Sequence, residues 1–142
     1  MKHIKDIKNK LDWEKYYNPD FDWNDYKFYS HNKLSENFIR EFKDKVNWEG
    51  ISECQTLSEN FIREFKDEVY WELISKYQTL SETFIREFED KVDWWYISKY
   101  QKLSEEFIRK FKDKIDWHIT SKYQKLSKEF KNELNKIFYE AD

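Results

Sequence analysis

Leu34 to Phe42 reads Leu-Ser-Glu-Asn-Phe-Ile-Arg-Glu-Phe, and this stretch decides the fold because it returns along the chain. An identical copy runs from Leu57 to Phe65, 23 positions later. Related copies begin 23 positions apart at Leu80 and Leu103, and a weaker one begins at Leu126. A second element lies between the copies, at Trp48–Gln55, Trp71–Gln78, Trp94–Gln101 and Trp117–Gln124. Self-similarity at a fixed period of this length predicts a stack of small repeated units.

The first element of each repeat is predicted to be a helix of about twelve residues. Apolar side chains recur on one face at helical spacing, at Phe38, Ile39, Phe42 and Val46. Ser35 is a favourable N-cap, and Glu36 follows it at the positive end of the helix dipole. Leu34 and Ile39 have the spacing of a hydrophobic staple. Glu36 also precedes Arg40 by four residues, which predicts an ion pair along one helix and a self-neutralised outer face.

The second element is predicted to be a shorter helix of about eight residues that needs packing to persist. Asn47, Asp93 and Asp116 stand at N-cap positions immediately before a tryptophan. Trp71, Ile74 and Tyr77 show the spacing that recurs within this element. The fold class is therefore all-α: a short α-solenoid of about five 23-residue two-helix repeats with N- and C-terminal caps.

The ends of the chain depart from the repeat. Residues 1–33 are expected to form an N-terminal cap with an irregular loop around Asn18–Asp20, and residues 34–142 the tandem repeats of one structural domain. His3–Trp13 resembles the first helix in its apolar spacing, and Asp22-Trp23 resembles the start of the second. If Trp23 begins the second element of the cap, the segment up to Leu34 has about two residues more than the same segment of a repeat. The unit from Leu126 onward is more polar and is expected to be the C-terminal cap.

Composition supports a packed domain in spite of high polarity. Hydrophobic and charged residues each make up 39% of the 142 residues, but 20% are aromatic and can supply a core. The formal net charge is -3, which favours neither phosphate-driven nucleic-acid binding nor a membrane surface. Cys54 is the single cysteine, and neither a signal peptide nor a membrane span is evident. We expect a cytoplasmic protein, in the host cytoplasm if it is viral.

The repeat resembles a family of 23-residue tandem repeats of the Ile-Ser-x-Tyr-Gln-x-Leu-Ser-Glu-x-Phe-Ile type, through Ile74 to Gln78 and Leu80 to Glu82. That family occurs in many proteins of large DNA viruses, phages and bacteria. The resemblance covers about 110 residues from Leu34 onward and implies an architecture rather than a function. An excess of Lys, Asn, Ile, Phe and Tyr over Ala, Gly and Pro also indicates an AT-rich genome.

No group of residues predicts catalysis, a metal or a cofactor. His3, His31 and His118 are far apart, and Cys54 occupies the position of Tyr77 in the next repeat. The repeated aspartates Asp44, Asp67, Asp90 and Asp113 are expected to accept from amides of the second helix or from an indole, with paired acid–base carboxylates as the alternative. The repeated glutamines Gln55, Gln78, Gln101 and Gln124 are expected to form a row of hydrogen bonds between repeats.

In a repeat protein, function is expected where the units differ. The most variable positions surround the start of the second helix, where Gly50, Leu73, Tyr96 and Ile119 share one column. The predicted partner-binding residues are Asn47, Glu49, Tyr70, Glu72, Trp95, Tyr96, His118 and Ile119. The alternative is neutral variation of a solvated surface.

These features favour a non-enzymatic scaffold that binds a protein partner, with an inhibitor of a host protein as a special case. A nucleic-acid binder would use Arg40, Arg63, Arg86 and Arg109 with stacking aromatics, although the adjacent glutamates oppose a basic stripe. A nucleic-acid mimic would present the aspartate column from Asp44 to Asp113. An enzyme is the least expected class, and the oligomeric state is left open.

Overall fold

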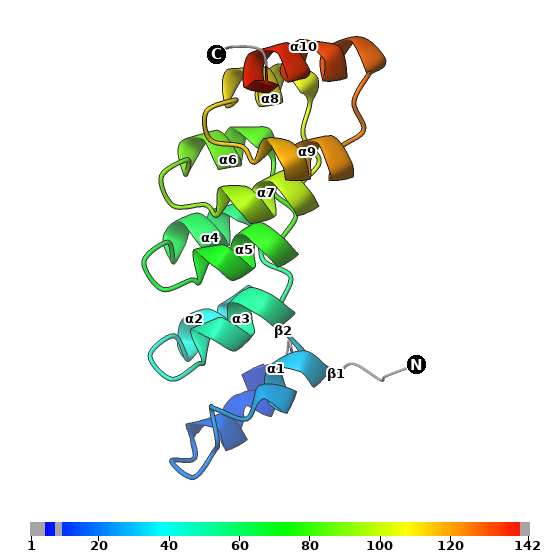
Figure 1. The fold of residues 1–142 in the computed structure, drawn as a ribbon. Helices are drawn as coiled ribbons and strands as arrows, with labels where there is room; N and C mark the ends of the chain where they lie inside the picture. The colour runs from blue at the N-terminus through cyan, green and yellow to red at the C-terminus, as the bar shows by residue number, and fades with distance from the viewer. Residues whose placement is uncertain (1–4, 8–9, 140–142) are drawn as a thin grey trace. The chain divides into compact units, whose positions relative to one another are not determined.

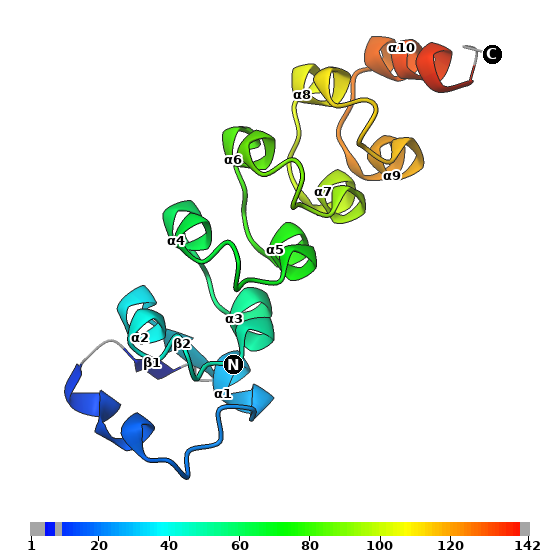
Figure 2. The same ribbon diagram turned by 90° about the vertical axis from the view of Figure 1, so that its left-hand side faces the viewer.

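The computed structural model describes residues 5–7 and 10–139 as a succession of helix pairs (Figures 1 and 2). This confirms the all-α, short-solenoid class with a spacing of about 23 residues between pairs. The chain forms two compact units, Met1–Gln78 and Thr79–Asp142. Within each unit, the first helices of the repeats lie in one row and the second helices in another (Figure 2). The division into a cap over residues 1–33 and one repeat domain over residues 34–142 stays a prediction.

Both units are built from short elements. The first unit contains β1 (Lys5–Ile7), the 3₁₀ helix η1 (Lys10–Tyr17), α1 (Tyr26–His31), β2 (Asn32–Leu34), α2 (Glu36–Glu41), α3 (Trp48–Cys54), α4 (Glu59–Glu64) and α5 (Trp71–Tyr77). The second contains α6 (Glu82–Glu87), α7 (Trp94–Tyr100), α8 (Glu105–Lys110), α9 (Trp117–Tyr123) and α10 (Lys128–Tyr139). In the first unit α3 packs between α1 and α5, and in the second α7 packs against α9. None of the helices among the described residues has the length and apolarity needed to cross a membrane.

The first helix of each repeat begins as predicted but ends early. The Ser35 hydroxyl accepts from the Phe38 amide at 3.0 Å, and Ser58, Ser81 and Ser104 cap the next helices in the same way. The predicted length of about twelve residues is wrong, since α2 has six residues. At Phe42 the backbone turns to φ −107° and ψ 26°, outside the α-helical region. The Val46 amide still donates to the Phe42 carbonyl at 3.0 Å, so Val46 reaches the core from a turn.

The second helices are capped largely as predicted. Asn47, Asp93 and Asp116 accept from amides of the first turn, whereas Tyr70 has no side-chain cap bond. A buried serine then links one second helix to the next. The Ser52 hydroxyl donates to the Trp48 carbonyl at 2.7 Å and accepts from the Tyr70 amide at 3.0 Å. This fixes where the following helix begins.

The predicted glutamine row is confirmed. The Gln78 side chain, 5% exposed, donates to the carbonyls of Ser52 at 3.0 Å and Gln55 at 2.6 Å, and accepts from the Leu57 amide at 3.0 Å. In the second unit, Gln124 makes the same three bonds to Ser98, Gln101 and Leu103. Each amide side chain thereby pairs backbone groups that neither helices nor strands satisfy.

The N-terminal segment differs from the predicted helix over His3–Trp13; His3 and Ile4 lie outside the described residues. Lys5–Ile7 instead forms a strand parallel to β2, in which Ile7 pairs with Leu34. The chain then enters η1, whose Trp13 and Tyr16 are buried against the Phe38 ring at centroid distances of 5.5 and 5.0 Å. Aromatic packing thus closes the open end of the first repeat.

The two extra residues predicted before Leu34 are also wrong. The second-type helix of the cap is α1, and its N-cap is Asp25 rather than Asp22. Tyr29 occupies the serine position, because the Asn47 amide donates to its hydroxyl at 2.7 Å with the 18-residue offset that Tyr70 and Ser52 share. From Tyr29 onward the cap therefore keeps the repeat register without an insertion, and its helix begins one residue later than in the repeats.

The predicted ion pair within the first helix is replaced by contacts between repeats. The Arg40 guanidinium binds the Glu64 carboxylate at 2.7 Å, and Arg109 binds Glu133 through two bonds of 2.9 Å. The Glu36 carboxylate accepts from the Ser58 amide at 2.8 Å. The outer face is nevertheless neutralised at these arginines, as expected.

Candidate functional site

The predicted site residues of the first unit divide into structural and exposed positions. The Asn47 side chain accepts from the Glu49 amide at 3.0 Å and the Gly50 amide at 3.3 Å, and so caps the N-terminus of α3. Glu49 and Glu72 are exposed, and Tyr70 is 50% exposed. Asn47 is therefore occupied as a helix cap, and only the other three residues offer exposed side-chain surface.

The variable column containing Gly50 has a packing explanation in the first repeat. A Cβ atom added at Gly50 would lie 2.7 Å from the Cδ2 atom of Tyr29. Tyr29 is the large residue that stands where other repeats have serine, so its ring fills the space that Leu73 or Tyr96 would need. The glycine and the tyrosine are complementary, which accounts for this position without a partner.

The second unit brings predicted residues together on α7. Trp95 is 41% exposed and meets Tyr96 edge to face, with ring centroids 5.1 Å apart. Tyr96 in turn stacks on Tyr100 at 6.0 Å. These two predicted residues and Tyr100 form a continuous aromatic surface, which we call the aromatic patch.

The remaining predicted residues lie on α9. The exposed His118 ring contacts the Tyr139 hydroxyl of α10 through Nδ1 at 3.0 Å, so it connects two elements of the second unit. Ile119 is half-buried, and its amide donates to the Asp116 carboxylate at 3.0 Å. These contacts give both residues a role within the second unit.

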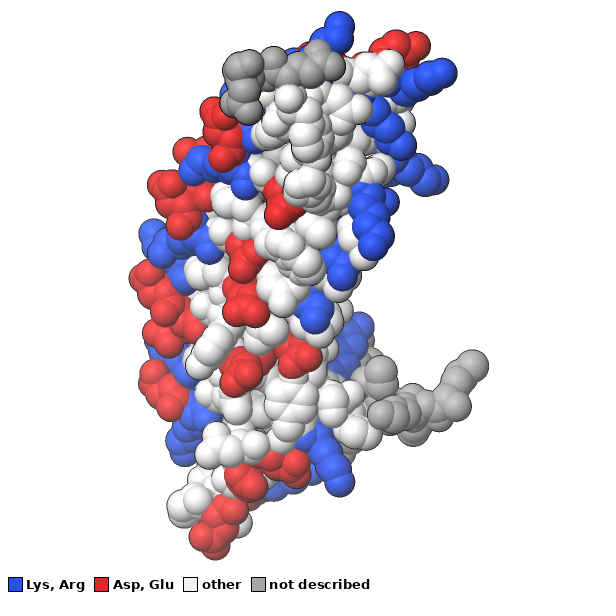
Figure 3. All heavy atoms as spheres, viewed as in Figure 1, with Lys and Arg blue, Asp and Glu red and all other residues white. Residues whose placement is uncertain are grey.

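Sequence comparison of the repeats missed a cluster of lysines beside this patch. The Lys99 ammonium lies 5.1 Å from the Trp95 ring centroid, 5.1 Å from that of Tyr100 and 5.0 Å from that of Tyr123. A groove of about 410 Å³ continues from there between the C-terminal ends of α7 and α9. We call it the lysine groove and define it by Lys99, Tyr100, Lys102, Tyr123 and Lys125. Figure 3 shows basic side chains gathered on the right of the view, at the height of α7 and α9.

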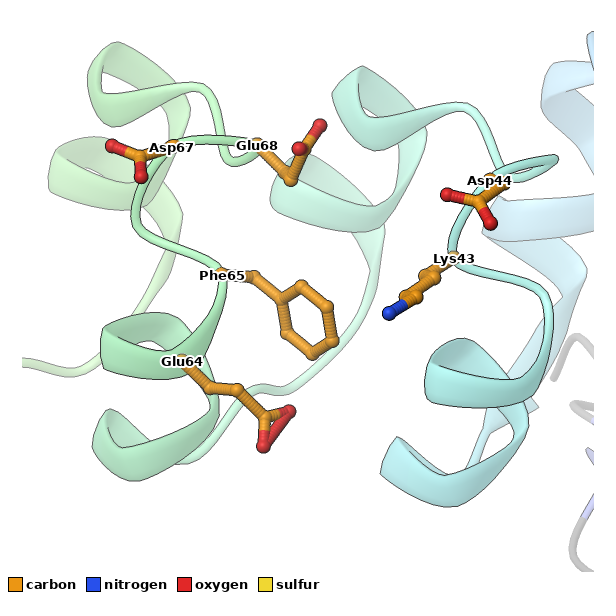
Figure 4. Close-up of a pocket in the computed structure, with 6 residues that line it drawn as sticks. All are labelled: Lys43, Asp44, Glu64, Phe65, Asp67 and Glu68. Carbon is orange, nitrogen blue, oxygen red and sulfur yellow. The ribbon is translucent and has the colours of Figure 1, made fainter.

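A second hollow, of about 200 Å³, collects the repeated aspartates of the first unit (Figure 4). Asp44 points into the space between two turns, whereas Asp67 points away from it. Glu64, which also lines the hollow, is bound by Arg40 at 2.7 Å. These carboxylates do not converge on one point, and over the described ranges no three His, Cys, Asp or Glu side chains form a metal-ligand group.

The predicted indole partner of the aspartates is wrong. The Trp48 indole donates to the Lys43 carbonyl at 3.0 Å, and Trp71 and Trp94 donate to Lys66 and Glu89 carbonyls in the same way. The first-turn amides of α3 are taken by Asn47. The indole thus satisfies a carbonyl of the turn, leaving the aspartate on the surface.

The remaining reactive side chains are dispersed. Cys54 is half-buried, and burial raises the pKa of its thiol, which disfavours the reactive thiolate. His31 contacts the Ser30 hydroxyl at 2.8 Å and the Lys27 carbonyl at 3.0 Å within its own helix. Among the described residues, no hydrogen bond joins the two side chains.

Comparison with known proteins adds no family name. No protein-family model matches the chain, and neither a curated protein nor a solved structure does so. The resemblance to the tandem-repeat family stays a prediction.

Proposed function

We propose that the protein is a non-enzymatic helical-repeat scaffold that binds a protein partner through the aromatic patch. The observation that carries the proposal is the exposure of 41% of Trp95 at a position where other repeats have Glu49, Glu72 and His118. Tryptophan and tyrosine are favoured anchors at protein interfaces, since each buries a large apolar area with few rotatable bonds.

The side chains of the aromatic patch are also preorganised for binding. Trp95 is fixed edge to face on Tyr96, and both lie in a helix whose N-terminus is capped by Asp93. A partner therefore gains contact area without ordering these side chains, which lowers the entropy lost on binding.

The two other readings have less support. A nucleic-acid binder needs unpaired cations along the first helices, but Arg40 and Arg109 each bind a glutamate of the following repeat. A nucleic-acid mimic needs a free acidic row, yet Asp90 lies 3.6 Å from the Lys114 ammonium. From the family resemblance we further propose a virus- or phage-encoded inhibitor that meets its target in the host cytoplasm.

The test exploits the repeat itself. Trp95→Glu with Tyr96→Leu makes residues 94–101 identical in sequence to residues 71–78, which already fold as α5. We expect unchanged helicity and loss of partner capture from a lysate treated with nuclease. Tyr26→Leu, at an exposed tyrosine of the first unit, is the matched control and keeps capture.

Two results would contradict the proposal. Capture that is equally strong with the double variant would show that the aromatic patch is not the binding surface. Capture that disappears on nuclease treatment would indicate that the protein binds nucleic acid and not a protein partner.

A further inference from the structure

The lysine groove concentrates positive charge that the protein itself does not neutralise. Lys99, Lys102 and Lys125 line it, and none of the lining residues is acidic. Among residues 5–7 and 10–139, no carboxylate forms an ion pair with any of these three ammonium groups. By contrast, Arg109 on the first-helix row is paired, and its guanidinium lowers the pKa of the Glu133 carboxyl by hydrogen bonding.

The charge of the groove is a property of particular repeats. Lysine stands at the position of Lys99 in three repeats and glutamate, Glu53, in the first. The position of Lys102 and Lys125 is threonine in the two earlier repeats, at Thr56 and Thr79. A fold that accepts glutamate and threonine at these places does not need lysine there. The lysines are therefore a feature that the architecture leaves open to selection for binding.

The groove is continuous with the aromatic patch. The Lys99 ammonium lies 5.0 to 5.1 Å from the ring centroids of Trp95, Tyr100 and Tyr123. A chain that seats an apolar side chain on Trp95 thus reaches cationic surface within one side-chain length. Lys102 and Lys125 are exposed beside these rings, so their ammonium groups are accessible to a carboxylate.

The arrangement suits a peptide better than a nucleic acid. Single strands bind by stacking bases on exposed aromatic faces. Here the Tyr123 ring carries the Lys99 ammonium at 5.0 Å and the Lys122 ammonium at 5.5 Å, so a base would have to displace a cation.

We propose that the lysine groove binds an acidic, extended segment of the protein partner, with carboxylates on Lys99, Lys102 and Lys125 and an apolar side chain on the aromatic patch. This inference rests on the proposed function and adds the chemical character of the partner. It assigns affinity to the patch and charge selectivity to the groove.

The test uses the full chain and a labelled peptide of alternating glutamate and serine, followed by fluorescence anisotropy at low salt. The same peptide with glutamine in place of glutamate is the uncharged probe, and a thymidine oligonucleotide is the nucleic-acid probe. We expect binding of the acidic peptide only, weakened by added salt. Lys102→Thr with Lys125→Thr, which places residues of earlier repeats, should weaken it roughly fivefold or more.

Two further variants make the result specific. Lys110→Gln with Lys131→Gln removes the same charge from exposed positions outside the groove and should leave binding unchanged. Lys102→Glu with Lys125→Glu should abolish binding of the acidic peptide and create binding of a lysine–serine peptide. Circular dichroism of each variant verifies that the helices are retained.

The inference is overturned if the acidic peptide binds the threonine variant as well as the original chain, or if the oligonucleotide binds more tightly and through the same lysines. Failure here is distinct from failure of the proposed function. A partner that is still captured through Trp95 from nuclease-treated lysate, without any peptide binding, would retain the scaffold and reject the acidic segment.

Discussion

At the scale of single residues, Tyr29 shows how one side chain can replace a repeated hydrogen bond. Its hydroxyl donates to the Trp23 carbonyl at 2.7 Å and accepts from the Asn47 amide at 2.7 Å, while the side chain is 1% exposed. Burial raises the pKa of Tyr29 from 10 to about 12. Between pH 10 and 12 the Tyr29 hydroxyl therefore keeps its proton in the folded protein and loses it in the unfolded chain.

This predicts loss of stability at alkaline pH. The contribution of Tyr29 is complete below about pH 10 and is lost as the pH rises toward 12, by up to about 3 kcal/mol. Tyr29→Phe should cost about 1–3 kcal/mol at neutral pH, because it leaves the Asn47 amide without its acceptor. Urea unfolding should show the gap between the two proteins narrowing with pH. A gap that stays constant would contradict the assignment.

Residue-scale predictions succeeded where the chemistry is local. Ser35 and Asp93 were identified as caps because a cap depends only on the next few residues. The match of Tyr29 to Gly50 was not foreseen, since it joins residues whose sequences give no sign of contact. The lysine groove was missed for another reason: comparison of repeats emphasised the start of the second helix and not its end.

At the scale of elements, the glutamine row supplies the hydrogen bonds that connect one repeat to the next. Helices of six or seven residues are too short to persist by themselves. Gln78 holds three backbone groups from two earlier segments, including the Ser52 carbonyl and the Leu57 amide. Its loss therefore acts on the connection between repeats.

We predict that Gln78→Leu destabilises the first unit by about 3 kcal/mol or more, because leucine fills the site but leaves buried backbone groups unpaired. Urea unfolding followed by far-ultraviolet circular dichroism measures the change. Thr56→Ala, at a neighbouring exposed position, serves as the control and should change stability by less than about 0.5 kcal/mol. A loss of similar size for both variants would show that the glutamine is not a specific link.

Within the repeats, element types were easier to predict than element lengths, whereas in the N-terminal segment the type itself was wrong. Apolar spacing from Phe38 to Val46 is the same whether the chain forms one long helix or a short helix and a turn, because both return Val46 to the core. The strand at Lys5–Ile7 has the same difficulty, as its pairing with β2 depends on residues 27 positions away. Periodicity alone cannot distinguish these cases.

At the scale of the whole molecule, the repeat should tolerate a change of number. A second copy of residues 56–78 in tandem would restore the same sequence at both junctions. Within each unit, neighbouring repeats are linked by the same glutamine and serine bonds, so we expect an added repeat to contribute its own interface to stability. We expect unchanged mean helicity per residue and a melting temperature higher by roughly 5 °C. A fall in mean helicity would show that the repeats are not equivalent modules.

Fold and function are separated at this scale. The architecture followed from the 23-residue period, since the period repeats every packing and capping position together. The site followed only in part, because a partner is recognised by surface side chains whose arrangement the period does not constrain. Trp95 and Tyr96 were named from their variability, whereas their contact with Lys99 required coordinates.

The complementary pair of Tyr29 and Gly50 bears on how such a gene can change. Recombination between similar stretches of coding sequence adds or removes whole repeats. We expect the fold to tolerate such a change among the middle repeats. The first repeat is different. A leucine or tyrosine at the position of Gly50, as at Leu73 and Tyr96 in later repeats, would collide with the Tyr29 ring. Lineages should therefore vary in the number of inner repeats while the cap and the glycine repeat are inherited as a linked pair.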